Sequence, residues 1–249
     1  MKIIAVIPAR YQSTRLPGKP LALISGIPMI QRVYEQAQKV KRLDEVIVAT
    51  DDERIYEFVK SFGGKVQMTK SNHQNGTERC AEIVQSKTDV DLVINIQGDE
   101  PFIAQEQIDL LIDQLLSQGK GIASLAKRID KMEDWLNPNI VKVLFDEKFK
   151  VLYFSRAPLP YHRDTNNTNW NNEQKYYKHI GLYGYYRNTL LEITKLAPSP
   201  LELAESLEQL RWLENGYTIG ISITNTESIA VDTKADIQKA EEWFRKQFN

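Results

Sequence analysis

The chain has 249 residues, 42% of them hydrophobic and 26% charged, a balance typical of a globular protein with one sizeable core. Its formal net charge of −1 argues against a general nucleic-acid-binding surface. The single cysteine, Cys80, excludes an internal disulfide, and no apolar run approaches the ~20 residues that a membrane helix needs. The N-terminus runs directly into an apolar segment without the pattern of a secretory leader. We therefore expect a cytoplasmic protein that binds neither nucleic acid nor membrane.

Apolar runs alternate with helical periodicities through the first half of the chain. In chain order they predict a strand at 3–7, a helix at 29–37, a strand at 46–49, a helix at 55–62, a strand at 65–69, a helix from about 76, a strand at 92–96 and a helix at 108–116. The first strand, Ile3-Ile4-Ala5-Val6-Ile7, is apolar throughout, as strands buried on both faces are. This order predicts an α/β fold with a mostly parallel, Rossmann-like sheet and helices on both faces.

The second half is smaller in helix content and richer in strands. Strands are predicted at about 122–126, 141–145, 151–154, 176–186 and 217–223, with helices over 201–214 and from about 234. The Asn-rich stretch from Asp164 to Gln174 predicts a surface loop. Because no linker separates independent folding units, we expect a single domain over 1–249, with halves at about 1–120 and 121–249.

A basic loop follows the first predicted strand, in the segment IPARYQSTRLPGKP. It carries three cations, two hydroxyls and a glycine: Arg10, Arg15, Lys19, Ser13, Thr14 and Gly18. Cationic side chains and loop N–H groups together bind triphosphates, and open α/β sheets bind ligands just past the C-terminal ends of strands. This position favours a triphosphate site over a solvated basic loop. The loop is no Walker motif, because Pro20 follows Lys19, and no GxGxxG pattern follows the strand.

Two further polar clusters follow predicted strands. Asp99, in the segment QGDEP, is a candidate Mg²⁺ ligand beside the triphosphate loop, although a turn or helix cap is the alternative. The segment SNHQNGTER at 71–79 predicts a helix start with Thr77 as N-cap, and it could also contact the base and ribose of a nucleotide. His73 in this segment lacks a second His or Cys nearby and is not predicted to bind a metal.

The polar residues of the second half carry less information by spacing alone. The tyrosines between positions 176 and 186 indicate a core or an interface, and Val231-Asp232-Thr233 indicates a helix N-cap. No Cys-His or Ser-His-Asp arrangement stands out, so covalent nucleophilic catalysis is not indicated.

Along nearly its full length the chain resembles the sugar nucleotidyltransferases, and specifically the CMP-Kdo synthetases (3-deoxy-manno-octulosonate cytidylyltransferases). The segments that carry the resemblance are IPARYQSTRLPGKP, HQNGTER, VINIQGDEP, YFSRAPLP, HIGLYGY, SPLELAESLEQLR and VDT. The resemblance implies transfer of a cytidylyl group from CTP to Kdo, an eight-carbon acidic sugar, with release of pyrophosphate. The product would serve lipopolysaccharide assembly in Gram-negative bacteria. The resemblance also implies Mg²⁺ as cofactor and a homodimer that contacts through part of the second half, which would also bind the sugar.

The resemblance implies roles for individual residues. The nucleotide would be bound by Ala9, Arg10, Ser13, Thr14, Arg15, Lys19, Asn72, Gln74 and Arg79. The sugar would be bound by Gln97, Asp99, His179, Tyr183, Glu208 and Gln209. Asp99 and Asp232 would ligate Mg²⁺ and act in catalysis with Lys19 and Arg15. Both aspartates are expected at the C-terminal ends of strands, which gather at one edge of a parallel sheet. Two residues depart from the family pattern: Asn72 stands where many members have Asp, and Tyr186 where many have Arg.

Three alternatives remain open. A related cytidylyltransferase could use another acidic sugar such as a sialic acid, although HIGLYGY and LEQLR speak against it. A regulatory module could bind a nucleotide without turnover, but pure binding could dispense with the second carboxylate, Asp232. A glycosyltransferase of similar fold would normally carry an Asp-X-Asp metal motif, and Asp51-Asp52 is not one.

Overall fold

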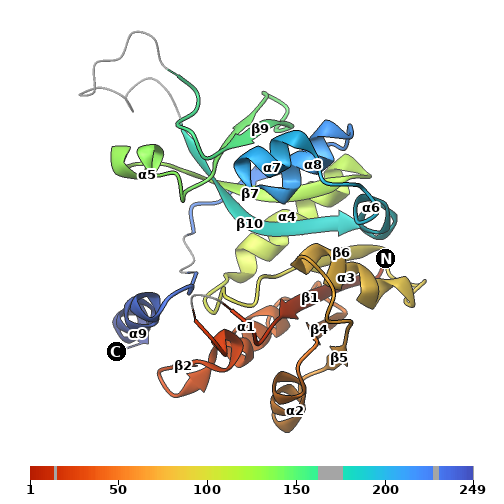
Figure 1. The fold of residues 1–249 in the computed structure, drawn as a ribbon, viewed down its shortest axis with the longest axis vertical. Helices are drawn as coiled ribbons and strands as arrows, with labels where there is room; N and C mark the ends of the chain where they lie inside the picture. Colours follow the sequence, from red (N-terminus) through yellow and green to blue (C-terminus); the bar gives the residue numbers. More distant parts are fainter. Residues whose placement is uncertain (14–15, 162–175, 227–229, 249) are drawn as a thin grey trace. The chain divides into compact units, whose positions relative to one another are not determined.

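The computed structural model describes residues 1–13, 16–161, 176–226 and 230–248 (Figure 1). The chain forms two compact units, unit 1 with Met1–Asp109 and Ser228–Asn249, and unit 2 with Leu110–Glu227. The units differ from the expected halves because the C-terminal segment belongs to the first. The nucleotide and sugar roles of the two halves stay predictions. Thr14, Arg15 and the loop expected at 164–174 lie outside the described residues.

Unit 1 is built on a parallel sheet. Its strands lie in the order β6-β1-β4-β5, with bounds β1 (Ile3–Ala9), β4 (Glu45–Thr50), β5 (Val66–Met68) and β6 (Leu92–Asn95). The connecting helices are α1 (Met29–Gln38), α2 (Glu53–Ser61) and α3 (Gly76–Gln85). From β1 to β5 the chain moves in one direction across the sheet, and α3 then returns it to the other side of β1. Because such crossovers are right-handed, α3 covers the face opposite to α1 and α2. The predicted α/β fold class is confirmed.

The reversal of strand order determines where unit 1 can bind a ligand. β1 and β6 are neighbours, yet the chain leaves their C-terminal ends toward different faces of the sheet. Their following loops therefore diverge and leave a crevice, the usual ligand site of open α/β sheets. The basic loop after β1 and the QGDEP segment after β6 both start at this crevice.

The C-terminal helix α9 (Lys234–Phe248) packs on unit 1, against residues that are distant in the sequence. Phe102 packs against Trp243 with ring centroids 4.5 Å apart, and the Arg32 guanidinium lies 4.4 Å from the centre of the Phe244 ring. Before α1 lie the short helix η1 (Lys19–Leu21) and the hairpin β2 (Leu23–Ile24) and β3 (Ile27–Pro28). The helix α4 (Gln105–Gln118) spans the sequence boundary between the two units.

Unit 2 contains a mixed sheet. β7 (Ile122–Arg128) pairs in parallel with β11 (Ile219–Ile223) and antiparallel with β10 (Tyr177–Tyr186). β8 (Lys142–Phe145) pairs antiparallel with β10 and with β9 (Val151–Ser155). The helices of this unit are α5 (Met132–Leu136), α6 (Arg187–Ile193), α7 (Pro200–Glu205) and α8 (Glu208–Glu214). Tyr176, Tyr183 and Tyr185 are buried, as the prediction of a tyrosine-rich core requires.

Two local predictions are wrong. The helix expected over 201–214 is interrupted at Ser206, whose positive φ of 52° ends α7 before α8 begins. The N-cap of α3 is Asn75 and not Thr77, because the Asn75 side chain accepts the Glu78 N–H at 2.8 Å. Thr77 lies inside the first turn and is buried.

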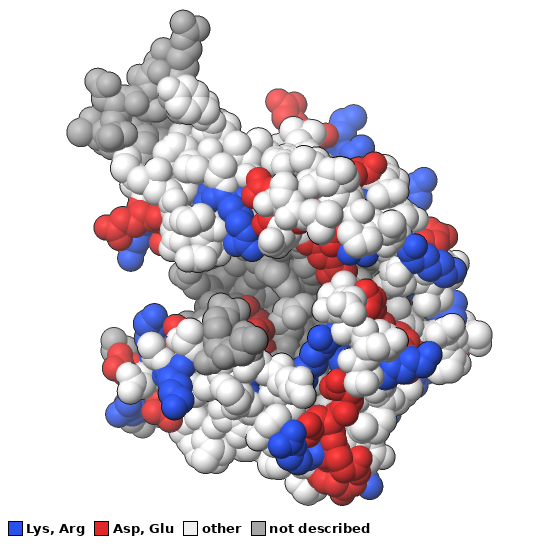
Figure 2. Space-filling model, in the orientation of Figure 1, with Lys and Arg blue, Asp and Glu red and all other residues white. Residues whose placement is uncertain are grey.

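The composition of the helices and of the surface is relevant to the expectations about membrane and nucleic-acid binding. Across the four described ranges, no helix is both long and apolar enough to cross a membrane. Basic and acidic side chains are interspersed on the face that Figure 2 shows, in keeping with the net charge of −1.

Candidate functional site

A cavity of about 600 Å³ lies in unit 1 at the C-terminal ends of β1 and β6. Four segments line it: the end of β1 with its loop, the start of α3, the turn after β6 and the segment before α9. The residues predicted from the sequence that line it are Ala9, Arg10, Ser13, Lys19, Gln74, Arg79, Gln97, Asp99 and Asp232. Lining residues that were not predicted are Pro8, Gln12, Pro20, Gly76 and Gly98. Asn72 is exposed and is not among the lining residues.

Gly98 is required by the close approach of the two strand ends. A Cβ atom at this position would lie 2.9 Å from the carbonyl oxygen of Pro8, closer than real side chains come to backbone. The glycine thus lets the turn after β6 pass against the end of β1. This contact brings Asp99 beside the basic loop.

Lys19 stands between two carboxylates in the cavity. Its Nζ lies 2.6 Å from an oxygen of Asp99 and 3.0 Å from an oxygen of Asp232. Gly18, with a φ of 70° in the left-handed region, turns the chain into η1 and so directs Lys19. Burial by itself would lower the pKa of Lys19, but the two carboxylates outweigh it and raise the pKa above its ordinary value. Lys19 is therefore a cation at neutral pH.

Asp232 reaches the cavity through a backbone contact and not at a strand end. β11 ends at Ile223, and Asp232 lies in an irregular segment before α9, so the predicted strand-end position is wrong. The Val231 N–H donates to the Asp99 carbonyl at 2.9 Å, which holds the segment against the turn after β6. The cap of α9 belongs to Thr233, which exchanges hydrogen bonds with Asp236. The Asp232 side chain instead contacts Lys19.

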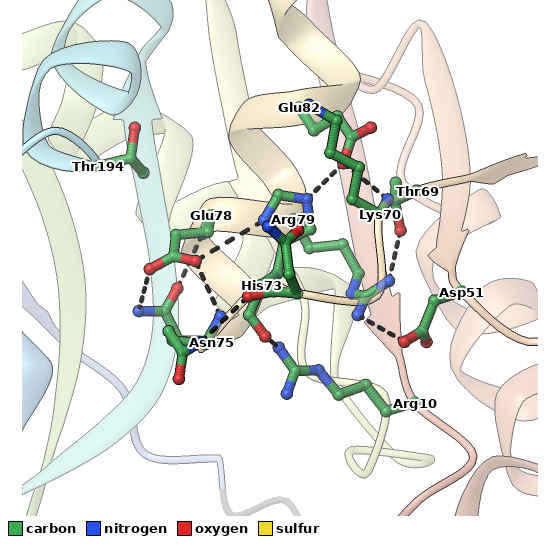
Figure 3. A network of polar contacts seen from close by, with 12 residues as sticks. Arg10, Asp51, Thr69, Lys70, His73, Asn75, Glu78, Arg79, Glu82 and Thr194 are labelled. Carbon is green, nitrogen blue, oxygen red and sulfur yellow. Dashed lines mark hydrogen bonds and ion pairs between the residues drawn. The ribbon is translucent and has the colours of Figure 1, made fainter.

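Two glutamates of α3 accept hydrogen bonds from the loop that precedes this helix (Figure 3). Glu82 accepts the Lys70 N–H at 3.0 Å and also contacts Nε2 of His73. Glu78, one turn earlier, accepts the Gln74 N–H at 2.8 Å. We call this arrangement of Glu78 and Glu82 against residues 70–74 the α3 clamp. It positions Gln74, which lines the cavity.

The α3 clamp also reaches the arginines of the cavity. Arg10 donates to the carbonyl oxygen of His73, so the clamped loop supports Arg10 (Figure 3). Arg79 is fully buried, contacts the Thr69 hydroxyl and lies 3.4 Å from an oxygen of Asp51. Its Nε has no hydrogen-bond partner among the described residues. Burial lowers the pKa of Arg79, and the positive charge of Arg10 adds to this effect. Two guanidinium groups that repel one another create a site that favours an anion.

The remaining predicted residues form a second group within unit 2. The rings of His179 and Tyr183 lie 5.3 Å apart, and Tyr183 packs edge-on against Trp212. The Tyr183 hydroxyl has no hydrogen-bond partner among the described residues. Burial, and then the negative charge of Glu208, raise the pKa of Tyr183 well above its ordinary value. The neighbouring Gln209 is buried.

Comparisons with known proteins agree on one family. The cytidylyltransferase family model matches residues 4–227. The 3-deoxy-manno-octulosonate cytidylyltransferase of Geobacter metallireducens is 49% identical, with 97% of each chain covered, and that of Parabacteroides distasonis is 51% identical, with 96% and 97% covered. A solved structure of CMP:2-keto-3-deoxy-manno-octonic acid synthetase complexed with CTP superposes with a TM-score of 0.93 at 40% identity, over 100% of each chain. The chain belongs to the 3-deoxy-manno-octulosonate cytidylyltransferase family.

Sequence reasoning about this family member missed the residues that support the site. Glu78 and Glu82 stand four positions apart on a predicted helix, and this spacing on one face was the available signal. Asp51, beside Arg79, follows a predicted strand directly. The roles of the lining residues and of the unit 2 group stay predictions.

Proposed function

We propose that this protein transfers a cytidylyl group from CTP to 3-deoxy-D-manno-octulosonate (Kdo), forming CMP-Kdo and releasing pyrophosphate. Curated relatives at 49% and 51% identity over nearly the whole chain bear the name of this activity, and this is the observation that carries the proposal. The cavity of unit 1 supports it, because cations and carboxylates converge there as nucleotidyl transfer requires.

The triphosphate of CTP would bind the cationic side of the cavity. Arg10, Ser13 and Lys19 line the cavity just past β1. Guanidinium and ammonium groups make the stronger class of hydrogen bond to phosphate oxygens. The raised pKa keeps the charge of Lys19 in place at neutral pH. Arg15 and Thr14 complete the predicted set of this loop, while Gln74 and Arg79 approach from α3.

The carboxylates of the cavity fit Mg²⁺. Asp99 and Asp232, far apart in the sequence, already converge on one cation, the Lys19 ammonium. The described residues contain no group of three or more His, Cys, Asp or Glu side chains that could hold a metal alone. Mg²⁺ is usually bound by one or two carboxylates together with phosphate oxygens and water, so this pair suits the ion in the presence of CTP. We propose Asp99 and Asp232 as its protein ligands.

Catalysis would then rest on positioning and charge neutralisation. The anomeric hydroxyl of Kdo attacks the α-phosphorus of CTP in line: its O–P bond forms, its proton passes to water, and the bond to pyrophosphate breaks. Arg10 and Lys19 neutralise the charge that develops on the leaving pyrophosphate. When bound, Mg²⁺ supplies Lewis-acid chemistry, because it lowers the pKa of the attacking hydroxyl and neutralises phosphate charge. No covalent enzyme intermediate is needed.

Within unit 2, Kdo would be recognised by four polar residues of the predicted sugar set, His179, Tyr183, Glu208 and Gln209. Gln97 and Asp99 of unit 1 stay predictions for this role. Buried polar side chains select strongly for hydroxylated ligands, because an analogue that lacks a hydroxyl leaves a partner unpaired. The buried Gln209 and the unpartnered Tyr183 hydroxyl of unit 2 are suited to this task.

We further propose that the enzyme works in the cytoplasm as a homodimer and supplies activated sugar for lipopolysaccharide assembly. The exposed Leu152 and Leu203 of unit 2 are candidates for the dimer contact. Sedimentation of the full chain would test the dimer directly.

The activity is tested by pyrophosphate release from CTP with and without Mg²⁺, over a panel of acidic sugars. We expect release only with Mg²⁺ and with Kdo or a close analogue. Equal turnover with a sialic acid would favour the alternative cytidylyltransferase. CTP binding without turnover of any sugar would favour the regulatory module, and transfer of a sugar from a nucleotide sugar would favour the glycosyltransferase.

A further inference from the structure

A buried serine connects the predicted sugar group to an irregularity in the sheet of unit 2. Ser124 on β7 is fully buried. It pairs with Tyr183 on β10, while the next residue of β7, Leu125, pairs with Ile180. Gly181 and Leu182 therefore lie between these two pairs and form a bulge on β10. Such bulges re-aim the side chains next to them. Ile180 and Tyr183 flank this one, and His179 lies one position before Ile180.

The Ser124 hydroxyl has three neighbours at hydrogen-bond distance. Its Oγ lies 2.9 Å from the carbonyl oxygen of Leu182, 3.2 Å from that of Ile180 and 2.8 Å from Nε2 of His179. The Leu182 carbonyl belongs to the bulge and the Ile180 carbonyl immediately precedes it, so both lie at the irregularity of β10. The histidine contact is the third partner of the same oxygen.

The chemistry of these partners determines which atom donates. A serine hydroxyl has one hydrogen and two lone pairs, whereas a carbonyl oxygen can only accept. Ser124 therefore gives its hydrogen to a bulge carbonyl, with Leu182 the nearer, and accepts from His179. In the reverse arrangement, two buried carbonyl oxygens would face the lone pairs of Oγ without a hydrogen between them, which is unfavourable. The hydrogen on the His179 ring accordingly resides on Nε2.

The other ring nitrogen is left as an acceptor. A neutral imidazole carries one N–H, so Nδ1 of His179 keeps a free lone pair. The ring packs against Phe154 and Tyr183, with centroids 4.9 and 5.3 Å away. Burial lowers the pKa of His179 to about 3, which keeps the ring neutral at physiological pH. The residue as a whole is half-buried.

We propose that Ser124 is a positioning residue that holds His179 as the Nε2–H tautomer, so that Nδ1 accepts a hydrogen bond from a hydroxyl group of the sugar and not from its carboxylate. The statement about the sugar rests on the proposed function, whereas the tautomer does not. A carboxylate is an acceptor only and would be repelled by Nδ1. The inference thus assigns His179 to the recognition of a hydroxyl.

Nitrogen NMR of the full chain tests the tautomer without any substrate. The chain has only three histidines, so a ¹⁵N-histidine-labelled sample gives few signals, and His179→Gln identifies those of His179. At pH 7.5 we expect a protonated Nε2 and an unprotonated Nδ1. An Nδ1–H tautomer or a charged ring in the wild-type protein would overturn the proposal, whatever the behaviour of any variant.

Two substitutions test the role of the serine. Ser124→Ala removes the acceptor of the Nε2–H, and we expect the two nitrogen shifts to move toward each other as the tautomers mix. We also expect the KM for Kdo to rise about tenfold, the effect of one lost hydrogen bond, with the KM for CTP unchanged. Ser124→Thr keeps the hydroxyl and should retain the wild-type shifts. Unchanged shifts in a folded Ser124→Ala would refute the positioning role.

Binding of Kdo tests the acceptor role of Nδ1. On addition of Kdo and a non-reactive CTP analogue we expect the Nδ1 shift to move and Nε2 to stay. A change confined to Nε2 would contradict the assignment to a hydroxyl. If the wild-type protein turned over no Kdo, the proposed function would fail, while the substrate-free spectrum would still decide what Ser124 does.

Discussion

Asp232 and Thr233 are neighbours in the sequence, yet the structure gives them separable tasks. The Asp232 carboxylate contacts Lys19 in the cavity, whereas Thr233 caps α9 through Asp236. Asp232→Asn keeps the shape of the side chain and removes its charge. Thr233→Ala keeps the charge at 232 and removes the cap. We expect the first variant to lose activity and the second to lose stability.

The expected losses of stability and of kcat/KM follow from the exposure of each side chain and from the type of contact it makes. The Asp232 side chain is 36% exposed, so its ion pair with Lys19 contributes at most about 1 kcal/mol to stability. A charged contact to the substrate complex is worth about 1.5–3 kcal/mol. That loss lowers kcat/KM by roughly 10- to 150-fold, since about 1.4 kcal/mol is tenfold in rate. Loss of a helix N-cap costs about 1 kcal/mol, and in a chain of this size that lowers Tm by about 2–4 °C.

Both variants are measured by pyrophosphate release over a Mg²⁺ titration and by thermal unfolding. Asp99→Asn and the double variant with Asp232→Asn extend the series. Because groups that act on one ion are non-additive, the double variant should be little worse than the poorer single one. Near-normal turnover in an Asp232→Asn protein with a lowered Tm would refute the reasoning and leave Asp99 as the only metal carboxylate.

Three other perturbations test further parts of the site. Lys19→Ala should lower kcat/KM at least tenfold with little change in Tm, since a charged contact is lost from a loop, while the exposed Lys41→Ala should match the wild type in the same assay. Glu82→Gln weakens the α3 clamp and should raise the KM for CTP several-fold without changing that for Kdo; the exposed Glu57→Gln is its control, and an equal rise for both substrates would contradict the role of the clamp. Burial lowers the pKa of His179 to about 3, so below pH ~6.5 the histidine is protonated in the unfolded chain before it is protonated in the folded one. The free energy of unfolding should therefore decrease by up to about 1.4 kcal/mol for each unit that the pH is lowered below ~6.5. Urea unfolding at pH 7.5 and 5.5 should show this extra loss in the wild type and not in His179→Gln, and parallel losses would show that another group is responsible.

The architecture of unit 1 and the chemistry of its basic loop could be predicted from the sequence alone. The apolar run of β1 and the 3.6-residue spacing in α1 and α2 are local patterns, and the residue types of Arg10 and Lys19 are themselves the signal for phosphate. The βα alternation indicates a parallel sheet, and the loop that follows its first strand is expected at the edge where such sheets bind ligands. The choice between two neighbouring N-cap candidates could not be made from the sequence. Asn75 and Thr77 are both good caps, and only the backbone geometry selects Asn75.

Only the tertiary structure decided how distant residues combine. Asp232 meets Lys19 because the Val231 N–H reaches the Asp99 carbonyl, a contact that leaves no periodicity in the sequence. The hydrogen bond between Ser124 and His179 likewise depends on the register of β7 against a bulge in β10. Sequence patterns report forces between residues a few positions apart, whereas these contacts depend on which segments the fold packs together. The residue types therefore indicate the predicted chemistry of the site, whereas the fold determines which of its charged and polar groups contact one another.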